Sequence, residues 1–200
     1  MKEIRIHGRG GQGAVIGGKI LAVAIFSEGQ FVQAFPSFGV ERRGAPVTAF
    51  VRIDSARIDL RSQIYRPDHL IVLDPTLLNL PPTFEGFKGE GWILINTARD
   101  PRELAKHPKL AGLRVATVDA NHIAVRNHLG SPQAPIVNTA ILGAFVRITG
   151  LCRWESLDQA IRKGSPIKPE ANAHAAKEAY DEVRLPADAD VPLRTPGATA

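Results

Sequence analysis

The chain has 200 residues, a hydrophobic fraction of 44% and a charged fraction of 22%, which is ordinary for a protein with a packed core. Its length suits one domain, with or without a short extension. The net charge of +5 allows an anionic ligand or partner, but the basic residues are scattered, which argues against a nucleic-acid-binding surface. The single cysteine, Cys152, excludes an internal disulfide and cannot alone hold zinc or an iron–sulfur cluster.

The sequence also gives no sign of a membrane segment. Its apolar stretches are shorter than the roughly 18–20 residues that a membrane-spanning helix needs. The first residues lack the basic and apolar regions of a secretory signal. Because cysteine is so scarce, a reducing compartment is favoured. We therefore expect a cytoplasmic chain without a membrane partner.

The chain begins with a strand, a glycine-rich turn and a helix. Residues 3–7 have strand character, and residues 14–26 form an apolar helix that we expect to be buried on more than one side. The turn between them fits the G-x-G-x-x-G pattern, in which backbone N–H groups and the positive end of a helix dipole meet an anion. The candidate phosphate-binding residues are Gly8, Arg9, Gly10, Gly11, Gln12 and Gly13.

Strands dominate the middle of the chain. Residues 31–35 and 47–53 read as strands, and the eleven residues between them are too few for a usual parallel crossover, so this pair is predicted to be antiparallel. Residues 69–74, 92–96 and 113–119 are near-continuous apolar runs, typical of central strands. The predicted fold is a single α/β domain with a mixed, mostly parallel central sheet flanked by helices.

The last part of the chain is predicted to be helical. Helices are expected at residues 121–129 and 136–149, and a capping-box spacing at Ser156 predicts the start of a short helix. Pro169 suits the first turn of a final helix. The predicted domain covers residues 1–183, and an extended or disordered tail covers residues 184–200.

The glycine turn has two interpretations, a tight turn without a ligand and a cradle for a phosphate. We favour the cradle, because Arg9 and Gln12 add polar side chains to the turn. An NAD-binding fold also needs an acidic residue at the end of its second strand, where this sequence has Ala34-Phe35-Pro36. This departure argues against ordinary NAD binding. A free-standing NAD(P)- or flavin-binding oxidoreductase domain is the alternative.

A second candidate site is the loop at residues 35–46, which is rich in phenylalanine, glycine, proline and charge. A solvated loop with an internal Glu–Arg pair is one interpretation. Exposed phenylalanine is unfavourable in water, long loops of this kind are often functional, and adjacent arginines suit an acidic partner surface. We therefore predict an interface formed by Phe38, Glu41, Arg42 and Arg43.

Other polar residues carry weaker signals. No histidine is paired with another ligand at metal spacing, so no metal site is predicted. Asp74 and Asp119 end predicted strands, where they could serve a ligand or cap the following turn. His7 precedes the glycine turn, and a structural role is favoured for it. No serine or cysteine lies in a nucleophile motif, so no catalytic residue is assigned.

Together, the two candidate sites resemble the gamma subunit of 2-oxoacid:ferredoxin oxidoreductases, of the pyruvate/2-ketoisovalerate type. The resemblance is carried by the glycine turn paired with Phe-Gly-x-Glu-Arg-Arg-Gly-Ala-Pro at residues 38–46. Residues 136–144 are similar to a helix of that family. The resemblance covers approximately residues 3–183.

This resemblance implies an accessory subunit of a multi-chain enzyme. Such enzymes oxidatively decarboxylate a 2-oxoacid, such as pyruvate or an aryl 2-oxoacid, on thiamine diphosphate and release an acyl-CoA. Thiamine diphosphate and the iron–sulfur clusters are expected on alpha, beta and delta-type partner chains, with ferredoxin or an NAD-reducing subunit as electron acceptor. The loop residues Glu41, Arg42 and Arg43 would face the catalytic subunits. The glycine turn would contact the phosphates of coenzyme A (CoA).

Overall fold

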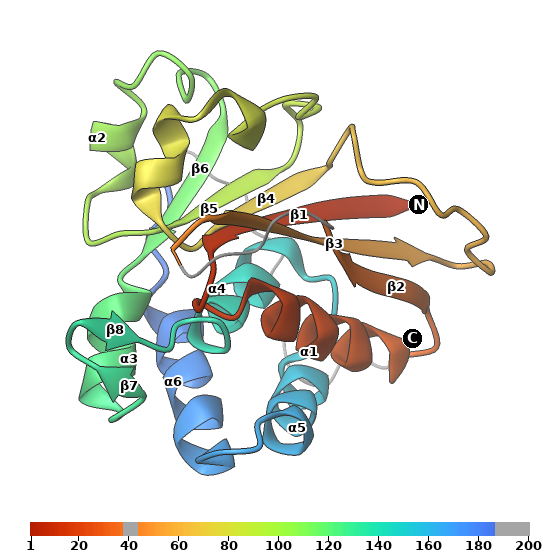
Figure 1. Cartoon of the computed structure of the whole chain (residues 1–200), viewed down its shortest axis with the longest axis vertical. Coiled ribbons are helices and arrows are strands. Elements are labelled where there is room, and N and C mark those ends of the chain that lie inside the picture. Colours follow the sequence, from red (N-terminus) through yellow and green to blue (C-terminus); the bar gives the residue numbers. More distant parts are fainter. Residues whose placement is uncertain (38–43, 187–200) are drawn as a thin grey trace.

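The computed structural model describes residues 1–37 and 44–186, which form a six-stranded sheet covered by helices (Figure 1). The strands lie in the order β2-β3-β1-β4-β5-β6. β1, β4, β5 and β6 are parallel, whereas β3 is antiparallel to both β1 and β2. The predicted mixed sheet and the predicted antiparallel pair are confirmed. The strands are β1 (Lys2–Arg9), β2 (Phe31–Pro36), β3 (Pro46–Asp54), β4 (His69–Val72), β5 (Trp92–Asn96) and β6 (Arg114–Val118).

Helices cover the two faces of the sheet unequally. Figure 1 shows α1, α4, α5 and α6 on one face, and the short elements η1, η2 and α2 on the other. The helices are α1 (Ala14–Phe26), α2 (Pro101–Leu104), α3 (Ala120–Arg126), α4 (Ala140–Thr149), α5 (Trp154–Gly164) and α6 (Pro169–Glu182). The 3-10 helices are η1 (Pro75–Asn79) and η2 (Pro81–Thr83), and a small hairpin joins β7 (Gly130–Ser131) to β8 (Ala134–Pro135).

Burial on both faces explains why the central strands are apolar throughout. Ile71 and Leu94 belong to the larger core, which the sheet shares with α1 and the C-terminal helices. Their neighbours Leu70 and Ile93 belong to a smaller core beneath η1. All four side chains are fully buried. Since successive side chains of a strand point to opposite faces, each face needs its own apolar row.

Small residues let the layers approach closely. A Cβ atom at Gly18 of α1 would make ordinary contacts with Val51 of β3, at 3.4 Å. The crossing of α4 and α6 is much tighter, because a Cβ atom at Gly143 would lie 1.8 Å from the carbonyl oxygen of Ala176. The backbones of these two helices are therefore in direct contact at that point.

The expected burial of α1 on more than one side is confirmed, although the burial is not complete. Ile16, Val23 and Phe26 are 50%, 52% and 64% exposed. Its buried residues face the sheet and α5. An apolar composition shows that a helix has a buried face, but it does not show where that face ends.

Two predicted helix starts also differ from the structure. The helix expected from residue 136 begins at Ala140, because the N–H of Ile136 donates to Leu129 instead of continuing a helix. Ser156 does not begin a helix either, since α5 starts at Trp154. Here the carboxylate of Glu28 accepts a 2.6 Å hydrogen bond from the N–H of Arg153, so a distant residue supplies the acceptor.

The last described residues of the chain contact the sheet. Arg184 forms an isolated antiparallel bridge with Thr117 of β6. Residues 187–200 lie outside the described part, and the division into a domain of residues 1–183 and a tail of residues 184–200 stays a prediction. Within residues 1–37 and 44–186, no helix is long and apolar enough to cross a membrane.

Candidate functional site

The glycine turn lies at the carboxyl edge of the parallel strands, between β1 and α1. Gly11 and Gly13 adopt positive φ angles of 100° and 77°, which side chains other than glycine rarely adopt. Gly13 is the N-cap of α1 and has no side chain to cap the helix. The first N–H groups of α1 are therefore not satisfied by a cap, which leaves them as donors at the start of the helix.

Asn138, from the segment before α4, supports this turn from behind. Its side-chain amide donates a 3.3 Å hydrogen bond to the carbonyl oxygen of Gly13. A Cβ atom at Gly13 would lie only 2.6 Å from that amide nitrogen. Glycine is thus required at this position both for its φ angle and for the space that Asn138 occupies. No local pattern in the sequence indicates this role for Asn138.

Arg9 braces the turn through its side chain. Its guanidinium forms a 2.7 Å ion pair with Asp74 at the end of β4 and donates to Thr76 and to the carbonyl oxygen of Gly44. Burial alone would raise the pKa of Asp74, but hydrogen bonds from Thr76 and Arg9 outweigh it and leave that pKa below its usual value. Asp74 is therefore charged at neutral pH, and its pair with Arg9 ties β1, the end of β4 and the loop before β3 together.

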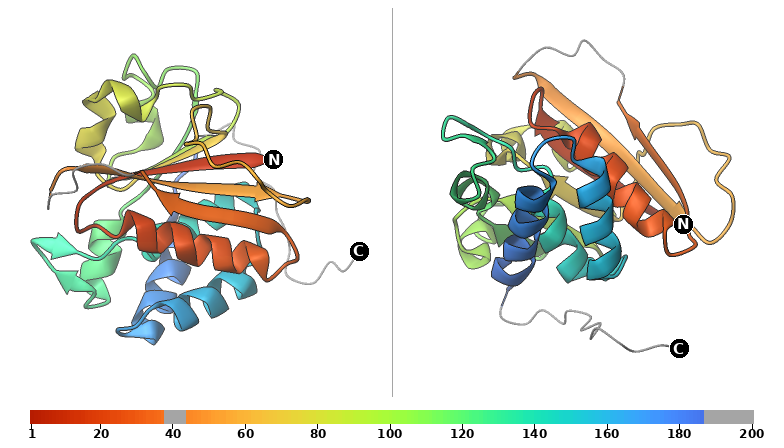
Figure 2. Two further views of the ribbon diagram at one scale, coloured as in Figure 1. Left: turned by 45° about the vertical axis from the view of Figure 1, so that its right-hand side comes forward. Right: turned by 90° about the horizontal axis from the view of Figure 1, so that it is seen from below.

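A pocket of about 510 Å³ opens in front of the turn. Gly10, Gly11 and Gln12 form one wall, and the β7–β8 hairpin forms another. Figure 2 shows the start of α1 and this hairpin at the same end of the molecule. The side-chain oxygen of Gln12 accepts a 2.7 Å hydrogen bond from the N–H of Arg9. The volume is within the range of small-molecule sites.

Asn121 lines the pocket and is held there by Asn96. Asn121, which lines the pocket, accepts a 3.0 Å hydrogen bond from the side chain of Asn96 at the end of β5. Asn96 also donates to the carbonyl oxygen of Leu73. The available signal was the position of Asn96 at the end of β5, where ligand sites of open sheets gather, and of Asn121 in the first turn of the helix after β6.

The two strand-end aspartates act as caps. Asp119 accepts a hydrogen bond from the N–H of His122 at the start of α3, at 2.9 Å. Asp74 accepts one from the N–H of Thr76 at the start of η1, also at 2.9 Å. The capping interpretation of both residues is confirmed, and Asp74 additionally lines the pocket.

His7 does not reach this pocket. It is 6% exposed and lies against Thr48 of β3, with 3.5 Å between Nδ1 and the Thr48 hydroxyl. Burial, and secondarily the charge of Arg5, lowers the pKa of His7 to about 3. The favoured structural role of this histidine agrees with its place in the sheet.

Because His7 is buried in its neutral form, we expect the protein to lose stability in acid. The folded pKa is about 3, below the unfolded value of 6.5, so the unfolded chain binds the extra proton and stability falls as the pH drops through this window. The expected slope is about 1.4 kcal/mol per pH unit for this one group. Urea unfolding at several pH values between 7 and 4 measures it. His7→Gln should have a shallower slope than the wild type, and equal slopes would contradict the assignment.

The remaining predicted residues are placed as follows. Cys152 is 2% exposed and belongs to the larger core, as expected for a small apolar side chain. Among residues 1–37 and 44–186, no group of three His, Cys, Asp or Glu side chains could hold a metal ion. The predicted interface consists of Phe38, Glu41, Arg42 and Arg43, and all four lie outside the described residues.

The fold and the pocket define an α/β domain with a ligand-sized site at the carboxyl edge of its sheet. A family model described as pyruvate ferredoxin/flavodoxin oxidoreductase matches residues 3–182. The chain is 50% identical, over 92% of its length and 98% of the relative, to the pyruvate/ketoisovalerate oxidoreductases common subunit gamma of Pyrococcus furiosus. It is 51% identical to pyruvate synthase subunit PorC of Methanocaldococcus jannaschii, over 92% and 97% of the two chains.

Solved structures agree with these sequence matches. The crystal structure of pyruvate oxidoreductase subunit PORC from Thermotoga maritima has a TM-score of 0.78 and 37% identity, over 92% of this chain and 97% of that one. This chain belongs to the pyruvate ferredoxin/flavodoxin oxidoreductase family, and it matches the gamma-type subunits of that family over nearly their whole length. The resemblance seen in the sequence is confirmed. The alternative of a free-standing NAD(P)- or flavin-binding domain is not supported.

Proposed function

We propose that this chain works as the gamma subunit of an assembly that oxidatively decarboxylates a 2-oxoacid to an acyl-CoA. In this proposal, thiamine diphosphate and iron–sulfur clusters are carried by alpha, beta and delta-type partner chains in the cytoplasm, and ferredoxin or an NAD-reducing subunit accepts the electrons. The observation that carries it is the match to gamma-type relatives over 92% of this chain. Pyruvate and branched 2-oxoacids are the first substrates to test, because the relatives are named for pyruvate and ketoisovalerate.

Within that assembly, Phe38, Glu41, Arg42 and Arg43 are proposed to face the catalytic chains. The adjacent arginines would pair with carboxylates of a partner, and the phenylalanine would anchor the contact in an apolar recess. Support comes from the residue types of this loop and from its attachment to the glycine turn. The N–H of Gly10 donates to Ala45, and the N–H of Gly44 donates to Gly10, at 2.8 and 3.1 Å. Gly44 and Ala45, which directly follow Arg43 in the chain, therefore lie beside the glycine turn.

We further propose that the pocket at the carboxyl edge receives the phosphates of CoA. Gly8, Gly10, Gly11 and Gly13 let the backbone approach an anion closely, and the uncapped start of α1 supplies N–H donors and a favourable dipole. The guanidinium of Arg9 is already paired with Asp74, so we assign Arg9 the role of holding the turn in shape. Gln12 stands in the pocket wall and contributes a polar side chain.

Two variants test the CoA proposal in the assembled enzyme. Asn121→Asp keeps the oxygen that accepts from Asn96 but adds a negative charge to the pocket wall, and it should raise the KM for CoA about tenfold. Gly11→Ala adds a methyl group that meets no protein atom within 4 Å, but the φ angle of 100° at Gly11 strains any side chain there, so a rise in KM would show that CoA binding depends on the backbone conformation of the turn. Steady-state kinetics at saturating 2-oxoacid measures both effects.

The matched control is Gln159→Glu, which makes the same charge change on the exposed side of α5. It should leave the KM for CoA unchanged. Each variant must copurify with its partner chains in the wild-type ratio, so that a failure of assembly is not mistaken for a failure of binding. An unchanged KM for CoA in Asn121→Asp and Gly11→Ala at intact assembly overturns the CoA proposal. A chain that is active when purified alone overturns the subunit proposal.

A further inference from the structure

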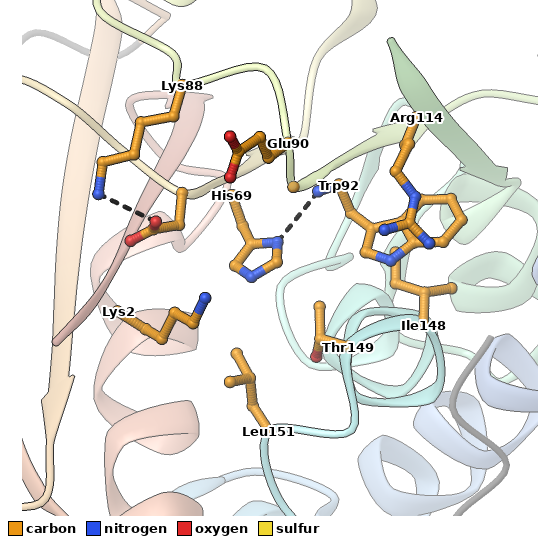
Figure 3. A pocket seen from close by; sticks show the side chains of 11 residues that line it. Lys2, His69, Lys88, Glu90, Trp92, Arg114, Ile148, Thr149 and Leu151 are labelled. Atoms are coloured by element: carbon orange, nitrogen blue, oxygen red, sulfur yellow. Dashed lines mark hydrogen bonds and ion pairs between the residues drawn. The ribbon is translucent and has the colours of Figure 1, made fainter. Parts of the chain in front are cut away.

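A second pocket, at the opposite edge of the sheet, has the features of an anion site. It lies where the parallel strands begin and has a volume of about 300 Å³ (Figure 3). The first residues of β1, β4, β5 and β6 line it, joined by the C-terminal end of α4. The glycine turn is at the carboxyl end of β1, so the two pockets share no lining residue.

His69 is the central group of this pocket. It is 9% exposed, and its ring stands edge-on to the ring of Phe145 with 5.8 Å between the centroids. Its Nδ1 atom accepts a 3.0 Å hydrogen bond from the N–H of Trp92. A backbone N–H can only donate, so Nδ1 carries no proton and the neutral ring must carry its proton on Nε2. Figure 3 shows the Nε2 side of the ring directed into the pocket.

Cationic groups surround this donor. Figure 3 shows the ammonium group of Lys2 directed toward the His69 ring. Within the described part of the chain, Lys2 forms no ion pair. The guanidinium of Arg114 lies 4.5 Å from the centre of the Trp92 ring, which forms another part of the wall. Lysine and arginine side chains supply only donors.

Neither carboxylate of the pocket forms an ion pair with Lys2. Asp68 is held by Lys88 at 2.9 Å and also accepts from the N–H of Glu3 at 2.7 Å, so its charge is compensated within the wall. Glu90 is the other carboxylate, and it is exposed. Lys2 therefore places a positive charge beside a buried N–H donor. An N–H donor next to a positive charge matches an oxyanion better than a neutral or cationic ligand.

We propose that this pocket binds a small oxyanion, a phosphate or a carboxylate, which accepts from Nε2 of His69 and pairs with Lys2. The pocket is large enough for inorganic phosphate or a small polycarboxylate, and Ile148 and Leu151 make part of its wall apolar. Binding here does not depend on the CoA proposal, because the pocket lies at the other edge of the sheet.

The test is a titration of the ¹⁵N-labelled full-length chain, followed by long-range ¹H–¹⁵N spectra of the histidine rings. The free protein should show His69 protonated on Nε2. Inorganic phosphate in one arm and citrate in the other should shift this resonance in a saturable way, with a Kd on the order of 1 mM or lower. Saturation in either arm supports the proposal and tells the two oxyanion classes apart. Sodium chloride at matched ionic strength should give no saturable shift.

Two lysine variants locate the binding. Lys2→Gln removes the exposed ammonium group beside His69 and should weaken binding about tenfold. Lys163→Gln removes the same charge from the exposed end of α5 and should not change the affinity. Non-saturable shifts in both arms overturn the proposal. An equal weakening by both variants also overturns it, because that result would reflect only the net charge of the chain.

Discussion

Gly143→Ala should lower the free energy of unfolding by about 3 kcal/mol or more. The new Cβ atom would lie 1.8 Å from the carbonyl oxygen of Ala176 and 2.7 Å from its carbonyl carbon. These are backbone atoms, so a change of side-chain rotamer cannot relieve the overlap, and α4 and α6 must move apart. The higher helix propensity of alanine, about 1 kcal/mol, offsets only part of this cost.

Gly18→Ala is the matched control for this prediction. It also replaces a glycine inside a helix, but its Cβ atom would make ordinary contacts, the nearest being Val51 at 3.4 Å. It should leave the stability unchanged or raise it by up to about 1 kcal/mol. Thermal unfolding followed by circular dichroism compares the two, with roughly 2–4 °C expected for each kcal/mol in a chain of this size. Equal melting temperatures for the two variants would refute the tight crossing of α4 and α6.

Glu3→Gln should lower the free energy of unfolding by about 3 kcal/mol, which is more than the effect expected for Arg52→Met. The Arg52 side chain is 1% exposed, and its guanidinium pairs with Glu3 at 2.9 Å and donates to Gln63 at 3.1 Å. It also lies 5.3 Å from the centre of the Phe35 ring. Removing the charge of Glu3 leaves a buried guanidinium without its counter-ion, whereas Arg52→Met removes the buried charge and keeps most of the volume.

The comparison of single and double variants decides this prediction. Glu3 is 15% exposed, so water can partly solvate its carboxylate in Arg52→Met, and the expected cost is about 1–2 kcal/mol. The double variant Glu3→Gln with Arg52→Met should recover most of the stability lost in Glu3→Gln alone. Urea unfolding at pH 7 provides the free energies. A smaller cost for Glu3→Gln than for Arg52→Met would show that the pair contributes through packing and not through charge.

Several local features could be predicted because their cause lies within a few residues. The helix at residues 14–26 follows from its apolar pattern and is confirmed as α1 (Ala14–Phe26). The predicted first-turn proline of the last helix is also confirmed, since α6 begins at Pro169. The antiparallel pair followed from a short connection. By contrast, the capping box at Ser156 failed because Glu28, 125 residues away from Arg153, accepts from the N–H before α5.

The sequence by itself determined the glycine turn, the positions of the buried strands and the family, because these depend on residue types at short spacing. Only the tertiary structure decided which side chains meet. Arg9 pairs with Asp74, 65 residues away, and Asn138 supports Gly13 from 125 residues away. The pocket around His69 is likewise assembled from the beginnings of four strands. Such contacts form when the sheet brings distant strand ends together, so short-range patterns in the sequence cannot identify them.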